Sequence, residues 1–229
     1  MTQKAYLVLE DGTTYAGESF GAATTSYGEA VFDTSMVGYQ EMLTDPSFAG
    51  QLLTLTYPLI GNYGINEIDN ESKQVQVRGL IVREHCEAPS HFESRQNVNE
   101  YLKAYGVPGI AGLDTRALTR KLRSSGVMMA VITSEMTPAE ALEALRSTPR
   151  YGSLNLAGQV STDGNYVVEP SGAARGLHVV LIDCGVKRSI VRFLTSYGCR
   201  VTVVPLTTSA ADVIKLRPNG VLLSPGPGD

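Results

Sequence analysis

The sequence has few of the residues that build metal centres and disulfide frameworks. It contains no tryptophan, three histidines and three cysteines in 229 residues. The cysteines, Cys86, Cys184 and Cys199, are odd in number and widely spaced, which excludes a disulfide framework. No Cys-x-x-Cys pair or Cys/His cluster is present, so we expect no metal site and no cofactor bound by this chain.

Positive charge and long apolar runs are also scarce. Lys and Arg number 19 against 23 Asp and Glu, a formal net charge of −4, which does not favour nucleic acid as a partner. The N-terminal apolar run, Ala5 to Leu9, is short and precedes Glu10 and Asp11, which is unlike a signal peptide or a membrane span. We therefore expect a cytoplasmic protein with no membrane partner, and the 43% of hydrophobic residues suffices for a globular core.

Residues 1–150 combine short strand patterns with helices. Asp11-Gly12 is a hairpin turn signal, and Gly61–Ser72 has the composition of a loop. The strands expected here are Ala5–Leu9, Thr13–Ala16, Glu29–Thr34, Gln51–Tyr57 and Val75–Val82. The helices expected here are Asn97–Tyr105, Thr115–Ser124 and Pro138–Arg146.

Two of these helices carry clear end signals. Asp114 or Thr115 caps the second helix, and Gly126 ends it. The third helix begins with a capping box formed by Thr137 and Glu140.

The remainder of the chain divides into a linker and a second domain. Residues 151–176 are rich in Gly, Ser, Asn and Thr, which predicts a linker with short extended pieces. Leu177–Asp183 is a continuous apolar run, typical of a strand buried on both faces of a parallel sheet. Two helices and two strands are expected after it, in alternation. They are the helix Lys187–Tyr197, the strand Cys199–Val204, a helix opened by Ser209 with Asp212, and the strand Val221–Ser224. This βαβαβ order predicts the start of a doubly wound α/β domain over residues 177–229.

The second domain is expected to be incomplete. Its third strand is apolar and would need cover on both faces, yet nothing follows it except a short loop. We therefore expect the last 50 or so residues to be poorly soluble or partly unfolded alone.

The final loop, Ser224-Pro225-Gly226-Pro227-Gly228-Asp229, follows a strand directly. Proline has no N–H, and glycine lets the backbone approach a ligand, so the glycine amides are the donors of a rigid loop. Such a loop suits an oxyanion hole. A plain Pro/Gly turn explains the spacing equally well. A phosphate cradle is disfavoured because the prolines remove half of its amides.

Longer segments carry a resemblance to a known family. The loop SPGPGD and the upstream DCGVKRSIVRFL resemble class I glutamine amidotransferases. Two segments of the N-terminal region resemble small subunits of carbamoyl phosphate synthetase. They are residues 32–64, FDTSMVGYQEMLTDPSFAGQLLTLTYPLIGNYG, and residues 109–123, GIAGLDTRALTRKLR. Other class I amidotransferases lack this N-terminal region. The resemblance implies an N-terminal mixed β/α domain over 1–150, followed by a truncated doubly wound class I glutamine amidotransferase domain over 177–229.

The resemblance also implies a reaction. In the family, a Cys thiolate activated by His and an acidic residue hydrolyses L-glutamine. The ammonia passes to a large synthetase subunit, which uses bicarbonate, ATP and Mg²⁺ to make carbamoyl phosphate for arginine and pyrimidine synthesis. By this resemblance Gly226 belongs to the oxyanion hole, and Ser47, Gly226 and Gly228 bind glutamine. No catalytic residue of the family is matched in the chain: the nucleophilic Cys and the His/Glu pair are expected beyond Asp229.

Two alternatives stay open. The chain is an inactive docking form of that subunit without glutaminase activity, or Cys184 substitutes for the missing nucleophile. The second is disfavoured, because His178 lies six residues earlier on the same strand. The arginine stripe of the helix Thr115–Ser124 is either a solvated face or a contact with an acidic surface of the large subunit. Its members are Arg116, Arg120 and Arg123. Tyr39 and Gly64–Asn70 are equally plausible interface elements.

Overall fold

The computed structural model describes residues 3–228, so Asp229 of the predicted loop lies outside the described residues. These residues form two compact units. The first contains residues 3–44 and 48–154, and the second contains residues 45–47 and 155–228. Within residues 3–228, no helix has the length and apolarity needed to cross a membrane.

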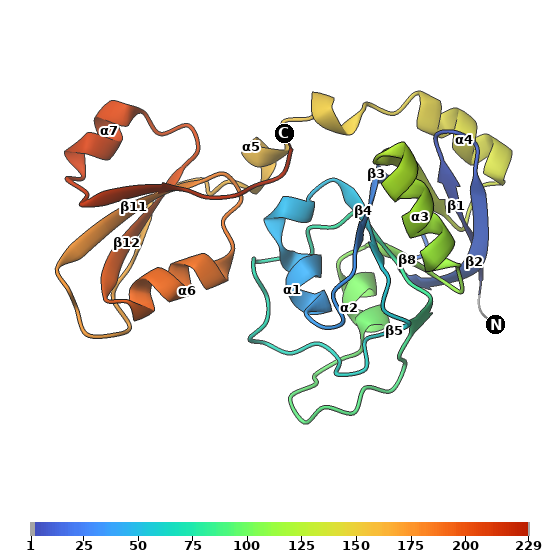
Figure 1. The fold of residues 1–229 in the computed structure, drawn as a ribbon, viewed down its shortest axis with the longest axis horizontal. Coiled ribbons are helices and arrows are strands. Elements are labelled where there is room, and N and C mark those ends of the chain that lie inside the picture. Colours follow the sequence, from blue (N-terminus) through green and yellow to red (C-terminus); the bar gives the residue numbers. More distant parts are fainter. Residues whose placement is uncertain (1–2, 229) are drawn as a thin grey trace. The chain divides into compact units, whose positions relative to one another are not determined.

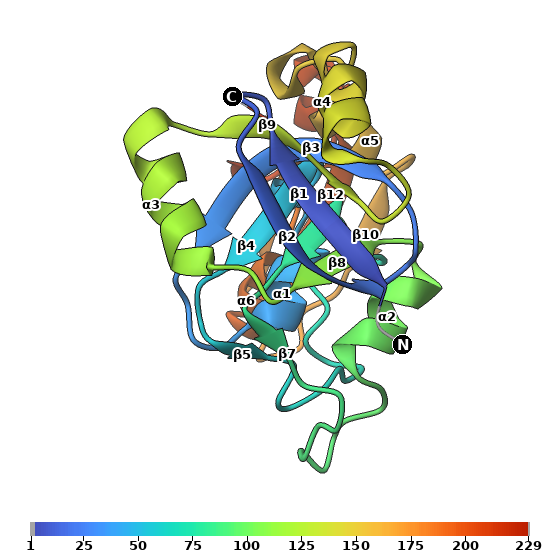
Figure 2. The ribbon, with the colours of Figure 1, turned by 90° about the vertical axis from the view of Figure 1, so that its right-hand side faces the viewer.

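The first unit is built on a closed barrel of seven strands in the order β1-β2-β8-β6-β4-β3-β9 (Figures 1 and 2). The strands are β1 Lys4–Leu9, β2 Thr14–Gly21, β3 Ser26–Asp33, β4 Gln51–Leu55, β6 Gly79–Ile81, β8 Pro108–Ala111 and β9 Met128–Thr133. β3, β4, β6 and β8 run parallel to one another, and β1, β2 and β9 complete the barrel with antiparallel pairs. A small parallel pair, β5 Leu59–Ile60 and β7 Glu84–His85, lies outside the barrel sheet.

Helices cover the barrel with their apolar faces. They are α1 Tyr39–Thr44, α2 Val98–Ala104, α3 Thr115–Ser125 and α4 Pro138–Arg146. Leu118 and Leu122 of α3 are buried in the cluster that contains Leu7 and Ile132 of the barrel. The predicted capping signals are confirmed: Asp114 accepts a hydrogen bond from Ala117 N, and the Thr137/Glu140 capping box is complete.

Several elements of this unit differ from the predicted ones. The strand predicted over Val75–Val82 is wrong, because only Gly79–Ile81 is extended and paired. Val75 and Val77 are buried in irregular backbone, which explains their apolar character. The short elements α1, β8 and β9 were not predicted.

The second unit contains a four-stranded sheet in the order β10-β12-β11-β13. Its strands are β10 Tyr166–Val168, β11 Leu177–Asp183, β12 Cys199–Pro205 and β13 Gly220–Leu223. β11 pairs in parallel with both β12 and β13, as expected for a doubly wound domain. α6 Arg188–Ser196 and α7 Ala210–Lys215 cover opposite faces of this sheet (Figure 1). The predicted fold class, a mixed β/α domain followed by the start of a doubly wound domain, is therefore confirmed.

Two features of the second unit concern the predicted linker and the last strand. Residues 151–176 contain α5 Leu156–Val160 and also β10, which pairs with β12 in antiparallel fashion. At the other edge of the sheet, Val221 and Leu223 of β13 are 50% and 67% exposed. The apolar last strand thus exposes two of its side chains to solvent.

Candidate functional site

The site is built at the carboxyl ends of two neighbouring parallel strands, β11 and β13. The Cys184-Gly185 turn follows β11, and the loop from Ser224 to Gly228 follows β13. A β-carbon at Gly226 would overlap with the carbonyl oxygen of Cys184, so only glycine fits this position. Strand ends of this kind are where ligands bind in open α/β sheets.

Ser224 holds the loop against the turn. Its hydroxyl accepts a hydrogen bond from Cys184 N at 2.9 Å and donates one to Pro225 O at 2.7 Å. Ser224 is buried, with 8% of its surface exposed, so these bonds are shielded from water. The loop therefore starts from a fixed point on the neighbouring strand.

Asp183 fixes the other side of the turn. Its Oδ1 accepts hydrogen bonds from Gly185 N at 2.9 Å and Val186 N at 2.7 Å, and its Oδ2 accepts one from Thr162 N at 2.9 Å. Three backbone N–H groups thus provide hydrogen bonds to this buried side chain. The turn that faces Gly226 is thereby rigid.

The segment 45–47 belongs to the same compact unit and reaches the same place. A β-carbon at Gly185 would lie 3.1 Å from Gly226 Cα, from Pro227 Cδ and from Pro46 Cβ. Asp45 Oδ2 and Lys187 Nζ form an ion pair at 3.1 Å. Asp45 Oδ1 accepts a hydrogen bond from Ser47 N at 2.9 Å. Pro46, one residue before Ser47, is thus held at the turn beside the loop.

The predicted glutamine-binding residues come from two segments far apart in the chain. Gly226 and Gly228 lie in the loop after β13, and Ser47 follows the proline that contacts the β11 turn. Gly226 N donates no hydrogen bond to any residue from 3 to 228. Gly228 has a φ of +95°, a backbone conformation that glycine adopts readily. The roles of all three in binding stay predictions.

Three residues that build this site carry no sequence signal of their own: Asp45, Asp183 and Ser224. Asp45 stands two residues before Ser47, and Ser224 opens the Pro/Gly loop, so both lay inside segments already noted. Their roles depend on partners distant in sequence, such as Lys187 and Cys184. A sequence pattern cannot supply those partners.

No cysteine of the described chain has a histidine positioned as its base. His178 Nε2 lies 2.8 Å from Thr202 Oγ1, and Cys184 stands six positions after His178, just beyond the end of β11, roughly 20 Å along the strand direction. His85 stacks on Phe20, with ring centroids 4.4 Å apart. In residues 3–228 no group of three or more His, Cys, Asp or Glu side chains is arranged to hold a metal ion.

Comparison with known proteins gives two family matches. Residues 7–132 match the family described as carbamoyl-phosphate synthase small chain, CPSase domain. Residues 180–229 match the family described as glutamine amidotransferase class-I. The two matches correspond to the barrel unit and to the sheet that carries the Pro/Gly loop.

Similar curated proteins span both regions. A carbamoyl phosphate synthase small chain of Nostoc sp. is 48% identical over 98% of this chain and 62% of its own length. Those of Fusobacterium nucleatum and Thermosynechococcus vestitus are 50% and 48% identical, over 97% and 100% of this chain. The chain spans 61% to 63% of the length of these relatives.

Proposed function

Because the chain belongs to the carbamoyl-phosphate synthase small chain family, we propose that it supplies the oxyanion loop and part of the glutamine site of a glutamine-hydrolysing enzyme. The observation that carries this proposal is the meeting of Gly226, Gly185 and Pro46 at the carboxyl ends of β11 and β13. A loop anchored in this way presents its amides in a fixed direction, as stabilisation of an oxyanion requires.

Each residue has a distinct part in the proposed reaction. Gly226 N donates to the oxygen that becomes negative when the side-chain amide of L-glutamine is attacked. Its lack of an acceptor among residues 3–228 supports this role. Gly228 and Ser47 bind the rest of the glutamine molecule. Pro225 and Pro227 limit the loop to one backbone shape because their φ angles are fixed.

The nucleophilic Cys and the His/Glu pair come, in this proposal, from sequence outside residues 1–229. Residues 1–229 alone therefore hydrolyse no glutamine, because no described Cys has a histidine within reach. In the assembled enzyme, ammonia passes to a large synthetase chain. That chain uses bicarbonate, ATP and Mg²⁺, and its carbamoyl phosphate serves arginine and pyrimidine synthesis.

A chimera tests the proposal. Residues 1–229 are joined to the part of the Nostoc small chain that lies beyond the matched segment, and release of glutamate and ammonia from glutamine is measured. We expect hydrolysis by the chimera and none by residues 1–229. Gly226→Ala in the chimera should lower kcat by on the order of a hundredfold or more, as expected when an oxyanion donor is displaced.

Two results would contradict the proposal. One is hydrolysis by residues 1–229 alone, which would point to Cys184. The other is a chimera that unfolds cooperatively and binds glutamine but hydrolyses none, which would favour a docking role without glutaminase activity. Gly220→Ala serves as the matched control, because a β-carbon at residue 220 meets no atom within 4 Å.

A further inference from the structure

A depression on the barrel unit has a composition unlike that of the proposed glutamine site. Its volume is about 640 Å³. Four arginines and four threonines line it, and Asp114 is the single acidic residue among its described lining residues. Its arginines are Arg83, Arg116, Arg120 and Arg123, and we call it the arginine depression.

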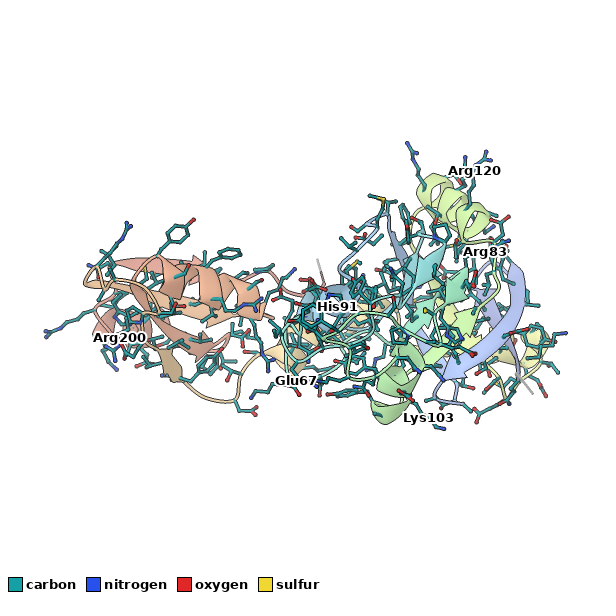
Figure 3. All side chains as sticks on the ribbon, turned by 90° about the horizontal axis from the view of Figure 1, so that it is seen from below. Glu67, Arg83, His91, Lys103, Arg120 and Arg200 are labelled. Carbon is teal, nitrogen blue, oxygen red and sulfur yellow. The ribbon has the colours of Figure 1, made fainter. Side chains whose placement is uncertain are left out.

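The fold explains why these residues meet. Thr34, Thr56 and Arg83 lie one or two residues beyond the ends of β3, β4 and β6, which are parallel neighbours. β8, the next parallel strand, leads into α3, which carries the other three arginines. The depression therefore lies at the carboxyl ends of four parallel strands, and Figure 3 shows Arg83 and Arg120 on the same side of the unit.

The positive charge of the depression is not neutralised from within. None of the four arginines forms an ion pair with a residue of the described range 3–228. Lys121 of the same helix differs, because its Nζ lies 2.6 Å from Asp11 Oδ2 and lowers the pKa of that carboxyl to about 2. Thr119 Oγ1, at the wall of the depression, is buried without a hydrogen-bond partner among the described residues. The four guanidinium groups are thus available to an anionic ligand.

Three observations favour protein carboxylates over a small phosphate. The arginines of α3 extend from residue 116 to 123, about 10 Å of helix, which is longer than one phosphate group. Asp114 Oδ1 already accepts from Ala117 N at the helix start, so negative charge occupies the place a phosphate would take. All four guanidinium groups belong to exposed residues, as an open docking surface requires.

We propose that the arginine depression docks a carboxylate-rich surface of a partner protein, and, resting on the function proposed above, that this partner is the large synthetase chain. Arginine suits this task because its planar fork binds carboxylates through two parallel hydrogen bonds. A positive surface on a chain of net charge −4 also steers an acidic partner to this side.

The test measures association of residues 1–229 with the large synthetase chain of the same organism at several salt concentrations. The site variant is Arg116→Gln/Arg120→Gln/Arg123→Gln, since glutamine keeps the helix propensity. The control variant, Arg95→Gln/Arg146→Gln/Arg200→Gln, removes the same charge from exposed surface ion pairs outside the depression. Thermal unfolding of both variants verifies that the fold is retained.

The site variant should bind at least about tenfold more weakly at low salt, mainly through a slower association rate, with a flatter salt dependence. The control variant should bind like the unaltered chain. Equal affinities of the two variants would overturn the proposal. So would saturable binding of inorganic phosphate at the arginines together with unchanged affinity for the large chain, which would identify a small-ligand site. If the unaltered chain does not bind the large chain while the chimera hydrolyses glutamine, the docking assignment fails and the glutaminase proposal stands.

Discussion

Gly226 and Cys184 meet where two neighbouring parallel strands end. The carbonyl oxygen of Cys184 lies so close to Gly226 that residue 226 has no space for a side chain. This close approach joins the loop after β13 to the turn after β11. The loop therefore depends on the packing of its own glycine as well as on the stiffness of its prolines.

Gly226→Ala should destabilise the second unit. The new methyl group overlaps the Cys184 carbonyl, so the loop or the turn must shift, at a cost of about 1–3 kcal/mol in the free energy of unfolding. Urea denaturation followed by circular dichroism measures the change. Gly220→Ala in β13 meets no neighbour within 4 Å and should change the unfolding free energy little. An equal effect of the two substitutions would show that residue 226 is not closely packed.

Ser224→Ala should loosen the same loop by a different route. It removes a hydroxyl that accepts from Cys184 N and donates to Pro225 O, leaving the Cys184 amide without that partner. We expect a loss of about 1–2 kcal/mol and a shifted amide resonance for Cys184 in an NMR spectrum. Ser196→Ala, at the exposed end of α6, is the control and should leave that resonance in place. An unmoved Cys184 amide in Ser224→Ala would contradict the anchoring role.

Local signals in the sequence predicted local structure well. The capping residues Asp114, Thr137 and Ser209 each accept the hydrogen bond that their position in the sequence indicates. A cap depends on residues within one turn, so its whole cause is present in a short segment. The apolar run Leu177–Asp183 likewise predicted a strand, but its burial is partial: Val180 and Leu181 are buried, whereas Leu177 is 43% exposed.

Closure of the barrel could not be predicted in the same way. β8, with the sequence PGIA, carries a weak strand signal because Gly109 has no side chain. The structure gives the reason: the ring of Phe20 occupies the space that a β-carbon at residue 109 would need. β9 closes the barrel by pairing with β1, more than a hundred residues earlier. Neither partner can be identified from the strand's own residues.

In the candidate site, too, the features set by neighbouring residues could be predicted, and those set by distant residues could not. The Pro/Gly loop was visible in the sequence because its shape follows from Pro225, Gly226 and Pro227 themselves. Pro46 lies beside Gly185, and its neighbour Asp45 forms an ion pair with Lys187, 142 positions away (187 − 45), so neither partner can be found from the local sequence. For Ser47, the resemblance to a family was the only sequence signal. The arginine stripe of α3 stayed ambiguous because Arg83 joins it only through the parallel order of the strands.

The exposed edge of the second sheet should promote self-association. Val221 and Leu223 project apolar side chains into solvent, and β13 is the last strand in its sheet order. Val221→Glu/Leu223→Glu should lower the fraction of oligomer, measured by sedimentation velocity, without loss of unfolding free energy. Leu222→Glu is the contrast, because Leu222 packs against the core cluster of Leu181 and Val203 and its replacement should unfold the unit. Unchanged oligomer content in the double variant would rule out the β13 edge as its cause.

His85 should make the stability of the barrel unit depend on pH. Its ring stacks on Phe20, and its Nδ1 is buried without a partner among the described residues. Burial lowers the pKa of His85, and the nearby Glu87, Glu18 and Glu84 oppose this shift only in part. The unfolded chain therefore binds the proton more tightly than the folded chain does. The stabilising contribution is full above the unfolded pKa of about 6.5 and is lost as the pH falls toward the lower folded pKa.

The prediction is a denaturation midpoint in urea that falls between neutral pH and mildly acidic pH. His85→Phe keeps an aromatic ring against Phe20 and removes the titrating group, so it should flatten this fall. The exposed His91 provides the control, and His91→Asn should leave the pH dependence as it is. If the midpoint of His85→Phe falls as steeply as that of the unaltered chain, a different group controls the acid sensitivity.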